Sequence, residues 1–241
     1  MNKPGIVLLI AISSMSLFNA KAQSANEIVN KWIGAMGGRE KLASFQTLYA
    51  ESDVNIMNNP ATSKTFLVNG KGYKTETDFS GQKIIDCYTV NGGWNINPLA
   101  GQATATPMTA IQVKLGQLQL EAAGPLFEYA SKGSKVELLG KEGFNGSNVY
   151  KLMLTTASGL QLSFFINDSS FYIMKQVTKT NADGQDIEIT IVSSDFRKTP
   201  NGFILPFSNE VSISGLTITI TSKKIEINSA IDPVIFEIPK N

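Results

Sequence analysis

The chain has 241 residues, of which 42% are apolar and 17% charged, so it can build a core and has too little charge for a disordered chain. Its formal net charge of +1 argues against a dedicated nucleic-acid binder, which needs a basic surplus. It has no histidine and one cysteine, Cys87, which excludes His-dependent catalysis, His-ligated zinc, internal disulfides and Cys-rich metal sites.

Residues 1–22 have the features of a secretory signal peptide. Lys3 supplies the positive start, an apolar stretch follows, and a small-x-small cleavage pattern ends at Ala22. The apolar stretch is shorter than the roughly 20 residues that a membrane-spanning helix needs, and no cysteine stands near the cleavage site to carry a lipid. We therefore predict export to the periplasm, cleavage after Ala22, and a single domain over 23–241 that does not span the membrane.

A helix is predicted at the start of the mature chain. Ser24 and Glu27 form a capping box, apolar residues follow at helical spacing, and Gly37-Gly38 ends the helix. After this helix, apolar residues recur at every second position, as in strands. Closely spaced turn signals predict that these strands are antiparallel and joined as meanders. The predicted strands are 46–56, 63–69, 72–79, 82–90, 134–141, 148–156, 160–167, 171–180, 185–195, 203–213 and 216–228. About eleven strands in one sheet must curl strongly, split or close.

Residues 91–133 interrupt this series of strands. Thr109 and Gln112 form a second capping box, and apolar residues continue at helical spacing to Leu118. Partial alternation in the same stretch leaves a strand as the alternative. A short helix is predicted at 126–130. Because the insertion is rich in apolar residues, we expect it to cover one face of the sheet.

Several short segments, in their order along the chain, resemble the periplasmic LolA-like family, the outer-membrane lipoprotein-sorting group. The segments are Asn91-Gly-Gly-Trp-Asn-Ile-Asn-Pro98 with Pro107-Met108 after it, and residues 35–38, 124–133, 136–140, 149–152, 201–207 and 227–239. The resemblance implies a mainly β (α+β) fold: a strongly curved antiparallel half-barrel whose concave apolar face lies beneath the helical lid. It also implies lipoprotein carriers and lipid-binding proteins as relatives.

Carboxylates near the turn at 183–184 are the main option left for acid–base catalysis. Asp183, Asp186 and Glu188 lie close together, but such groups on an exposed strand usually form a solvated face. Phosphate-binding glycine loops and the calcium-loop signature are absent from the sequence. We therefore predict no enzyme activity, no cofactor and no metal, and we interpret Cys87 as a small buried hydrophobe.

Ligand binding is the better-supported hypothesis, because a curved sheet beneath an apolar lid can hold an apolar ligand. Trp94 and Met108 are the strongest candidates, because they are expected in loops, where a large apolar side chain calls for a functional explanation. The full set of candidate cavity residues is Leu48, Val54, Phe66, Ile84, Trp94, Leu99, Met108, Ile111, Leu115, Leu118, Leu152, Leu154, Phe164 and Ile173. The predicted ligand is a lipid or a lipoprotein acyl chain, carried by a monomer.

The alternative hypothesis is a structural or interaction module of the cell envelope, with a filled core and a protein partner on an edge strand. The two hypotheses differ in whether a continuous apolar cavity of roughly a few hundred Å³ lies beneath residues 91–133.

Overall fold

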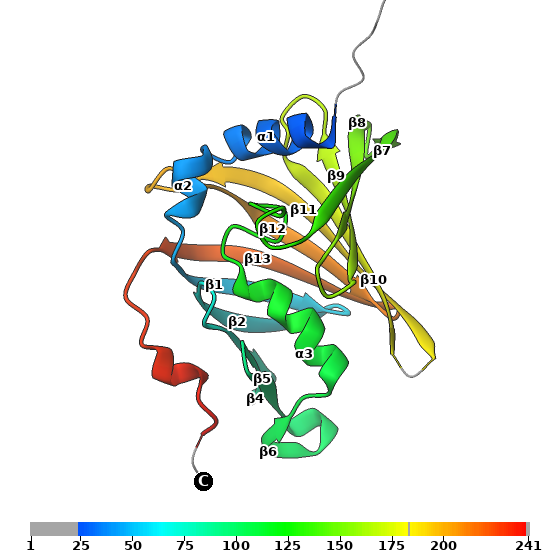
Figure 1. Ribbon diagram of the computed structural model, residues 1–241. Coiled ribbons are helices and arrows are strands. Elements are labelled where there is room, and N and C mark those ends of the chain that lie inside the picture. The colour runs from blue at the N-terminus through cyan, green and yellow to red at the C-terminus, as the bar shows by residue number, and fades with distance from the viewer. Residues whose placement is uncertain (1–23, 183, 240–241) are drawn as a thin grey trace, which may run out of the picture.

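The computed structural model describes residues 24–182 and 184–239, so the predicted signal peptide lies outside the described residues. Within them, 13 strands form one antiparallel sheet in the order β6-β5-β4-β3-β2-β1-β13-β12-β11-β10-β9-β8-β7 (Figure 1). Apart from the pair β1 and β13, all neighbouring strands in the sheet are consecutive in sequence, and β6 and β7 form its two edges. The strands are β1 (Thr47–Ile56), β2 (Asn59–Val68), β3 (Gly72–Phe79), β4 (Gln82–Thr89), β5 (Gly92–Asn97), β6 (Gln102–Pro107), β7 (Lys135–Phe144), β8 (Ser147–Thr155), β9 (Gln161–Asn167), β10 (Ile173–Ala182), β11 (Gln185–Lys198), β12 (Ile204–Ile213) and β13 (Leu216–Ile227).

The helices are few and short. They are α1 (Ala25–Ala35), α2 (Arg39–Ala43), α3 (Ala110–Gly116) and three 3-10 turns, η1 (Pro98–Ala100), η2 (Gln117–Leu120) and η3 (Pro233–Phe236). Both predicted capping boxes are present: Ser24 and Glu27 cap α1, and Thr109 and Gln112 cap α3. The helix predicted after Thr109 is therefore confirmed, and the strand alternative for this stretch is wrong.

Two-residue turns join many of the strands. Ser214 and Gly215 have φ of +48° and +82° between β12 and β13, so both central residues are left-handed, as a type I′ hairpin turn requires. Met57 and Asn58 form the same kind of turn between β1 and β2, with φ of +50° and +66°. The second strand was predicted from residue 63, whereas β2 begins at Asn59 and contains Pro60. Proline is tolerated there because the pairing with β3 begins only at Thr62.

The prediction of about eleven strands missed one hairpin, β5 and β6, inside the segment 91–133. Gly92, Gly93 and two asparagines give β5 a low strand propensity, and β6 is an edge strand that ends in Pro107. The predicted helix at 126–130 was also wrong. Glu128 has φ of +49°, which interrupts a helical path, and the segment is a succession of turns.

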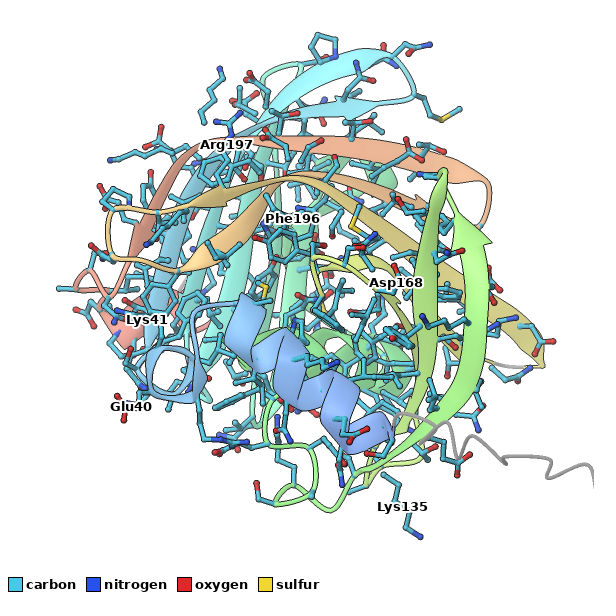
Figure 2. All side chains as sticks on the ribbon, turned by 90° about the horizontal axis from the view of Figure 1, so that it is seen from above. Glu40, Lys41, Lys135, Asp168, Phe196 and Arg197 are labelled. Carbon is cyan, nitrogen blue, oxygen red and sulfur yellow. The ribbon has the colours of Figure 1, made fainter. Side chains whose placement is uncertain are left out.

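Different segments of the chain pack on the two faces of the curved sheet. We call the face that carries α1 and α3 the inner face and the opposite one the outer face. Figure 1 shows α1 and α3 on one side of the sheet, and Figure 2, seen from above, shows α1 across the hollow of the curved strands. The outer face of β3 to β5 is covered instead by the C-terminal segment with η3, where Phe236 packs with Cys87 and Trp94.

Candidate functional site

A continuous row of apolar side chains crosses the inner face. Residues that stand directly opposite each other on neighbouring strands share a face, and the pairing register therefore places one residue from each of eight adjacent strands in this row. Gln176 is its single polar member. The row, which we call the inner row, is Leu138, Leu152, Phe164, Gln176, Ile191, Val211, Ile218 and Ile56.

Burial changes along the inner row. Leu152 and Phe164 are 0% and 1% exposed, because α1 and the turns at Leu126 and Phe127 pack onto them. From Ile191 on β11 to the far end on β1, the row is only half-buried. The inner row thus starts inside a filled core and continues as a partly uncovered apolar surface.

A cleft of about 660 Å³ lies at the turn between β4 and β5. Its walls combine the segment before and within α3, including Met108 and Val113, with the C-terminal segment, including Phe236. Val90 and Ile238, which are 58% and 59% exposed, also line it. Large aliphatic groups at an open cleft are unusual for a surface that contacts water alone.

A second, charged depression of about 360 Å³ lies at β1 to β3 and β13. Its charges are largely paired within the chain: Lys74 Nζ lies 2.8 Å and Lys83 Nζ 3.6 Å from the Glu76 carboxylate. Burial works in the opposite direction, but the hydrogen bonds and charges of these two lysines lower the pKa of Glu76 below its usual value. Because these charges pair within the protein, we interpret the depression as a structural feature rather than a binding site.

The acid–base candidates do not assemble into a catalytic arrangement within the described residues. The exposed Glu188 carboxylate pairs with Lys179 at 2.9 Å, as expected of a solvated face, and Asp183 lies outside the described residues. No cluster of His, Cys, Asp and Glu able to hold a metal ion occurs in the described ranges.

Three titratable groups on β4 have shifted pKa values. Cys87 is fully buried on the outer face, and burial raises the pKa of its thiol to about 12. The prediction that Cys87 is a buried strand residue is thereby confirmed. Asp86 and Tyr88 point to the inner face, where burial raises the pKa of both groups.

The structure divides the predicted cavity residues into several regions. One group lies in or against the filled core between α1, the insertion and β8 to β10: Leu115, Leu118, Leu152, Leu154, Phe164 and Ile173. Leu48, Val54 and Ile84 lie on the inner face of β1 and β4, outside that core. Ile111 is half-buried on α3, and Leu99 is 54% exposed on η1.

Two of the predicted cavity residues lie on the outer face instead. Phe66 and Trp94 pack with Phe236 of the C-terminal segment. The expectation that Trp94 lies in a loop was wrong, since it is a β5 residue, whereas Met108 does lie in a loop. Trp94 and Met108 nevertheless both line the 660 Å³ cleft.

The far half of the inner row was missed by reasoning from the sequence. A signal was present, because Ile187, Ile189 and Ile191 alternate with polar or smaller residues along β11. Alternation alone predicts an apolar face for each strand, but it does not say which strands lie beyond the helices.

Comparison with solved structures identifies the fold. The chain superposes on a LolA superfamily protein from Nitrosomonas europaea with a TM-score of 0.57 and 13% identity, covering 91% of this chain and 99% of that one. A domain described as an outer membrane lipoprotein-sorting protein, from Vibrio parahaemolyticus, gives 0.55 and 13%, covering 87% and 94%. A DUF1329 family protein from Desulfovibrio piger gives 0.58 and 12%, covering 90% and 98%. No family model and no curated protein matches the sequence.

The protein therefore has a LolA-like fold, as the sequence motifs predicted: a mainly β, curved antiparallel sheet with a helical insertion. Among the described residues, none of the helices is long and apolar enough to cross a membrane.

Proposed function

We propose that this protein is exported to the periplasm, is cleaved after Ala22, and binds a lipid or the acyl chains of a lipoprotein there without catalysing a reaction. In this proposal residues 23–241 act as a single domain and a monomer. The observation that carries it is the half-buried part of the inner row, Ile191, Val211, Ile218 and Ile56.

An acyl chain lying on these residues would bury apolar surface that is partly in contact with water in the free protein. Each CH₂ group taken out of water contributes about 0.8 kcal/mol. The neighbouring filled core supports one end of the row rigidly, because Leu152 and Phe164 have no room to move away. The similarity in fold to a lipoprotein-sorting domain supports the same ligand class.

A second candidate function is favoured by the filled core itself. Leu126 and Phe127 from the insertion are 1% and 8% exposed and pack in one buried cluster with residues of α1, β8 and β9. In this alternative the protein is an envelope interaction module whose partner pairs with an edge strand, β6 or β7.

Matched substitutions on one strand test the first proposal. Ile191 faces the inner row, and its neighbour Val192 points to the outer face, where it stands opposite Lys175. Both are half-buried. Ile191→Thr should weaken binding of a fluorescent fatty acid at least about tenfold, which corresponds to ~1.4 kcal/mol, while Val192→Thr should leave it within about twofold.

Native mass spectrometry of protein purified from membranes gives the second readout. We expect a bound species with the mass of one or two acyl chains. Equal effects of the two substitutions, or no uptake of any apolar probe by the wild type, would contradict lipid binding and favour the interaction module.

A further inference from the structure

Asp86 is a carboxylate without a partner on the inner face of β4. Its neighbours across the sheet are Thr75 on β3 and Asn95 on β5. Among the described residues its side chain makes neither a hydrogen bond nor an ion pair, and burial raises its pKa. A carboxylate removed from water is costly unless it is protonated or meets a cation.

Two tyrosines stand beside this carboxylate. Tyr88 follows two residues later on the same face, and Tyr73 lies directly opposite Tyr88 with the ring centroids 6.4 Å apart. Burial, and then the charge of Asp86, raise the pKa of Tyr73 to about 12, and the same two causes raise the pKa of Tyr88. The strand register gives the geometry: Asp86 and Tyr88 are two residues apart on the same face of β4, and Tyr73 on β3 is the diagonal neighbour of Asp86.

The insertion packs closely on Tyr88. Gly116 at the end of α3 lies so near Tyr88 that a Cβ atom there would be 2.0 Å from the ring. Gln117 then links η2 to β4, because its side-chain amide donates hydrogen bonds to the backbone carbonyls of Thr89 and Val90 at 3.2 and 3.1 Å. Lys114, the basic residue in the last turn of α3, forms no ion pair among the described residues, so α3 does not neutralise Asp86.

We propose that Asp86, together with Tyr73 and Tyr88, binds the ammonium head group of an amphiphile whose apolar chain lies along the inner face. The carboxylate supplies the opposite charge, and the aromatic rings attract a cation through their negative faces. This inference rests on the proposed lipid-binding function and narrows its ligand class to amphiphiles with a cationic group.

The distances along the sheet define how far such a ligand would extend. The row of Asp86 continues through Thr75 and Thr65 to Ala50 on β1, and Val54 lies four residues farther along β1 on the same face. Three strand spacings and four residues correspond to ~20 Å on a flat sheet. One acyl chain in half of a ~30 Å bilayer core spans ~15 Å, so a chain anchored at Asp86 covers most of the distance to Val54, and Ile56 of the inner row lies two residues beyond Val54.

The test compares two amphiphiles with the same chain and a similar head group, dodecyltrimethylammonium and the uncharged dodecyldimethylamine oxide, by calorimetry below their micellar concentrations. We expect the wild type to bind the cation about tenfold more tightly. Asp86→Asn should abolish this preference and leave the affinity for the amine oxide within about twofold.

The control is Glu137→Gln, which removes the same charge from an exposed position on β7 and should change neither affinity. If the wild type binds both probes equally, or if both substitutions weaken the cation equally, the ammonium site is wrong while lipid binding stands. If neither probe binds, the proposed function itself fails.

Discussion

Trp94 Nε1 donates a hydrogen bond of 3.0 Å to the backbone carbonyl of Phe236, which joins a strand of the insertion to a residue near the C-terminus. The Cys87 thiol lies 3.5 Å from the same carbonyl oxygen. Gly72 on β3 makes this contact possible, because a Cβ there would lie 2.4 Å from the Phe236 ring. The C-terminal segment is thus held on the outer face mainly by the buried Phe236, with the half-buried Ile231 and Ile235 packed beside it.

Phe236→Ala should therefore destabilise the protein by ~3 kcal/mol, the usual cost of removing a buried phenylalanine. Loss of the packing around Trp94 should also shift its fluorescence to longer wavelengths. The control is Val234→Ala in the same turn, where the side chain is 54% exposed, and it should change stability by less than ~0.5 kcal/mol. Equal losses in the two variants would show that Phe236 does not anchor the segment.

The two helical glycines Gly116 and Gly34 should respond in opposite ways to alanine. At Gly116 the new Cβ would overlap the Tyr88 ring, so we expect a loss of ~1–3 kcal/mol. At Gly34, which is exposed in α1 with no atom within 4 Å of the new Cβ, the gain in helix propensity should stabilise by ~1 kcal/mol. Urea unfolding measures both effects, and a stabilising Gly116→Ala would contradict the close contact between α3 and β4.

Cys87 should not react with alkylating reagents in the native protein at pH 8. Its thiol is fully buried, and burial raises its pKa to about 12, so almost no thiolate is present. Mass spectrometry after iodoacetamide treatment should show labelling only when urea unfolds the chain. Phe236→Ala should speed labelling, because Phe236 packs against Cys87. Rapid labelling of the native wild type would show that the C-terminal segment does not seal this face.

Asp86→Asn should change the pH dependence of stability in a defined direction. The pKa of Asp86 is raised on folding, so the native state binds this proton more tightly than the unfolded state does. The contribution of Asp86 to stability is then most favourable below its unfolded pKa and is lost as the pH rises through its raised native pKa. Relative to the wild type, Asp86→Asn should gain stability as the pH rises through that range.

Thermal unfolding between pH 3 and pH 8, with Glu137→Gln as the control, measures this difference. A constant offset between Asp86→Asn and the wild type at every pH would show that Asp86 is not desolvated. Addition of dodecyltrimethylammonium should reduce the difference at pH 7 if the ammonium site is present, because the cation stabilises the ionised carboxylate only in the wild type.

Local signals in the sequence were sufficient for most elements. The Ser24–Glu27 and Thr109–Gln112 capping boxes form as predicted, because both depend only on residues three apart. Turn pairs such as Ser214-Gly215 likewise determine where hairpins reverse. The hairpin β5–β6 was missed because its strand character depends on pairing with β4 rather than on its own glycine-rich sequence.

The sequence by itself determined that the protein is a meander of antiparallel strands with one capped helix before the first strand and another within the insertion. Only the tertiary structure decided which segment of the chain covers each face of the sheet. Trp94 and Tyr88 lie on adjacent strands of one hairpin, yet Trp94 packs beneath the C-terminal segment and Tyr88 beneath α3. Alternation tells which side chains share a face. Which segment covers that face depends on contacts between residues far apart in the sequence, such as Gln117 with Thr89 and Trp94 with Phe236, which no local pattern encodes.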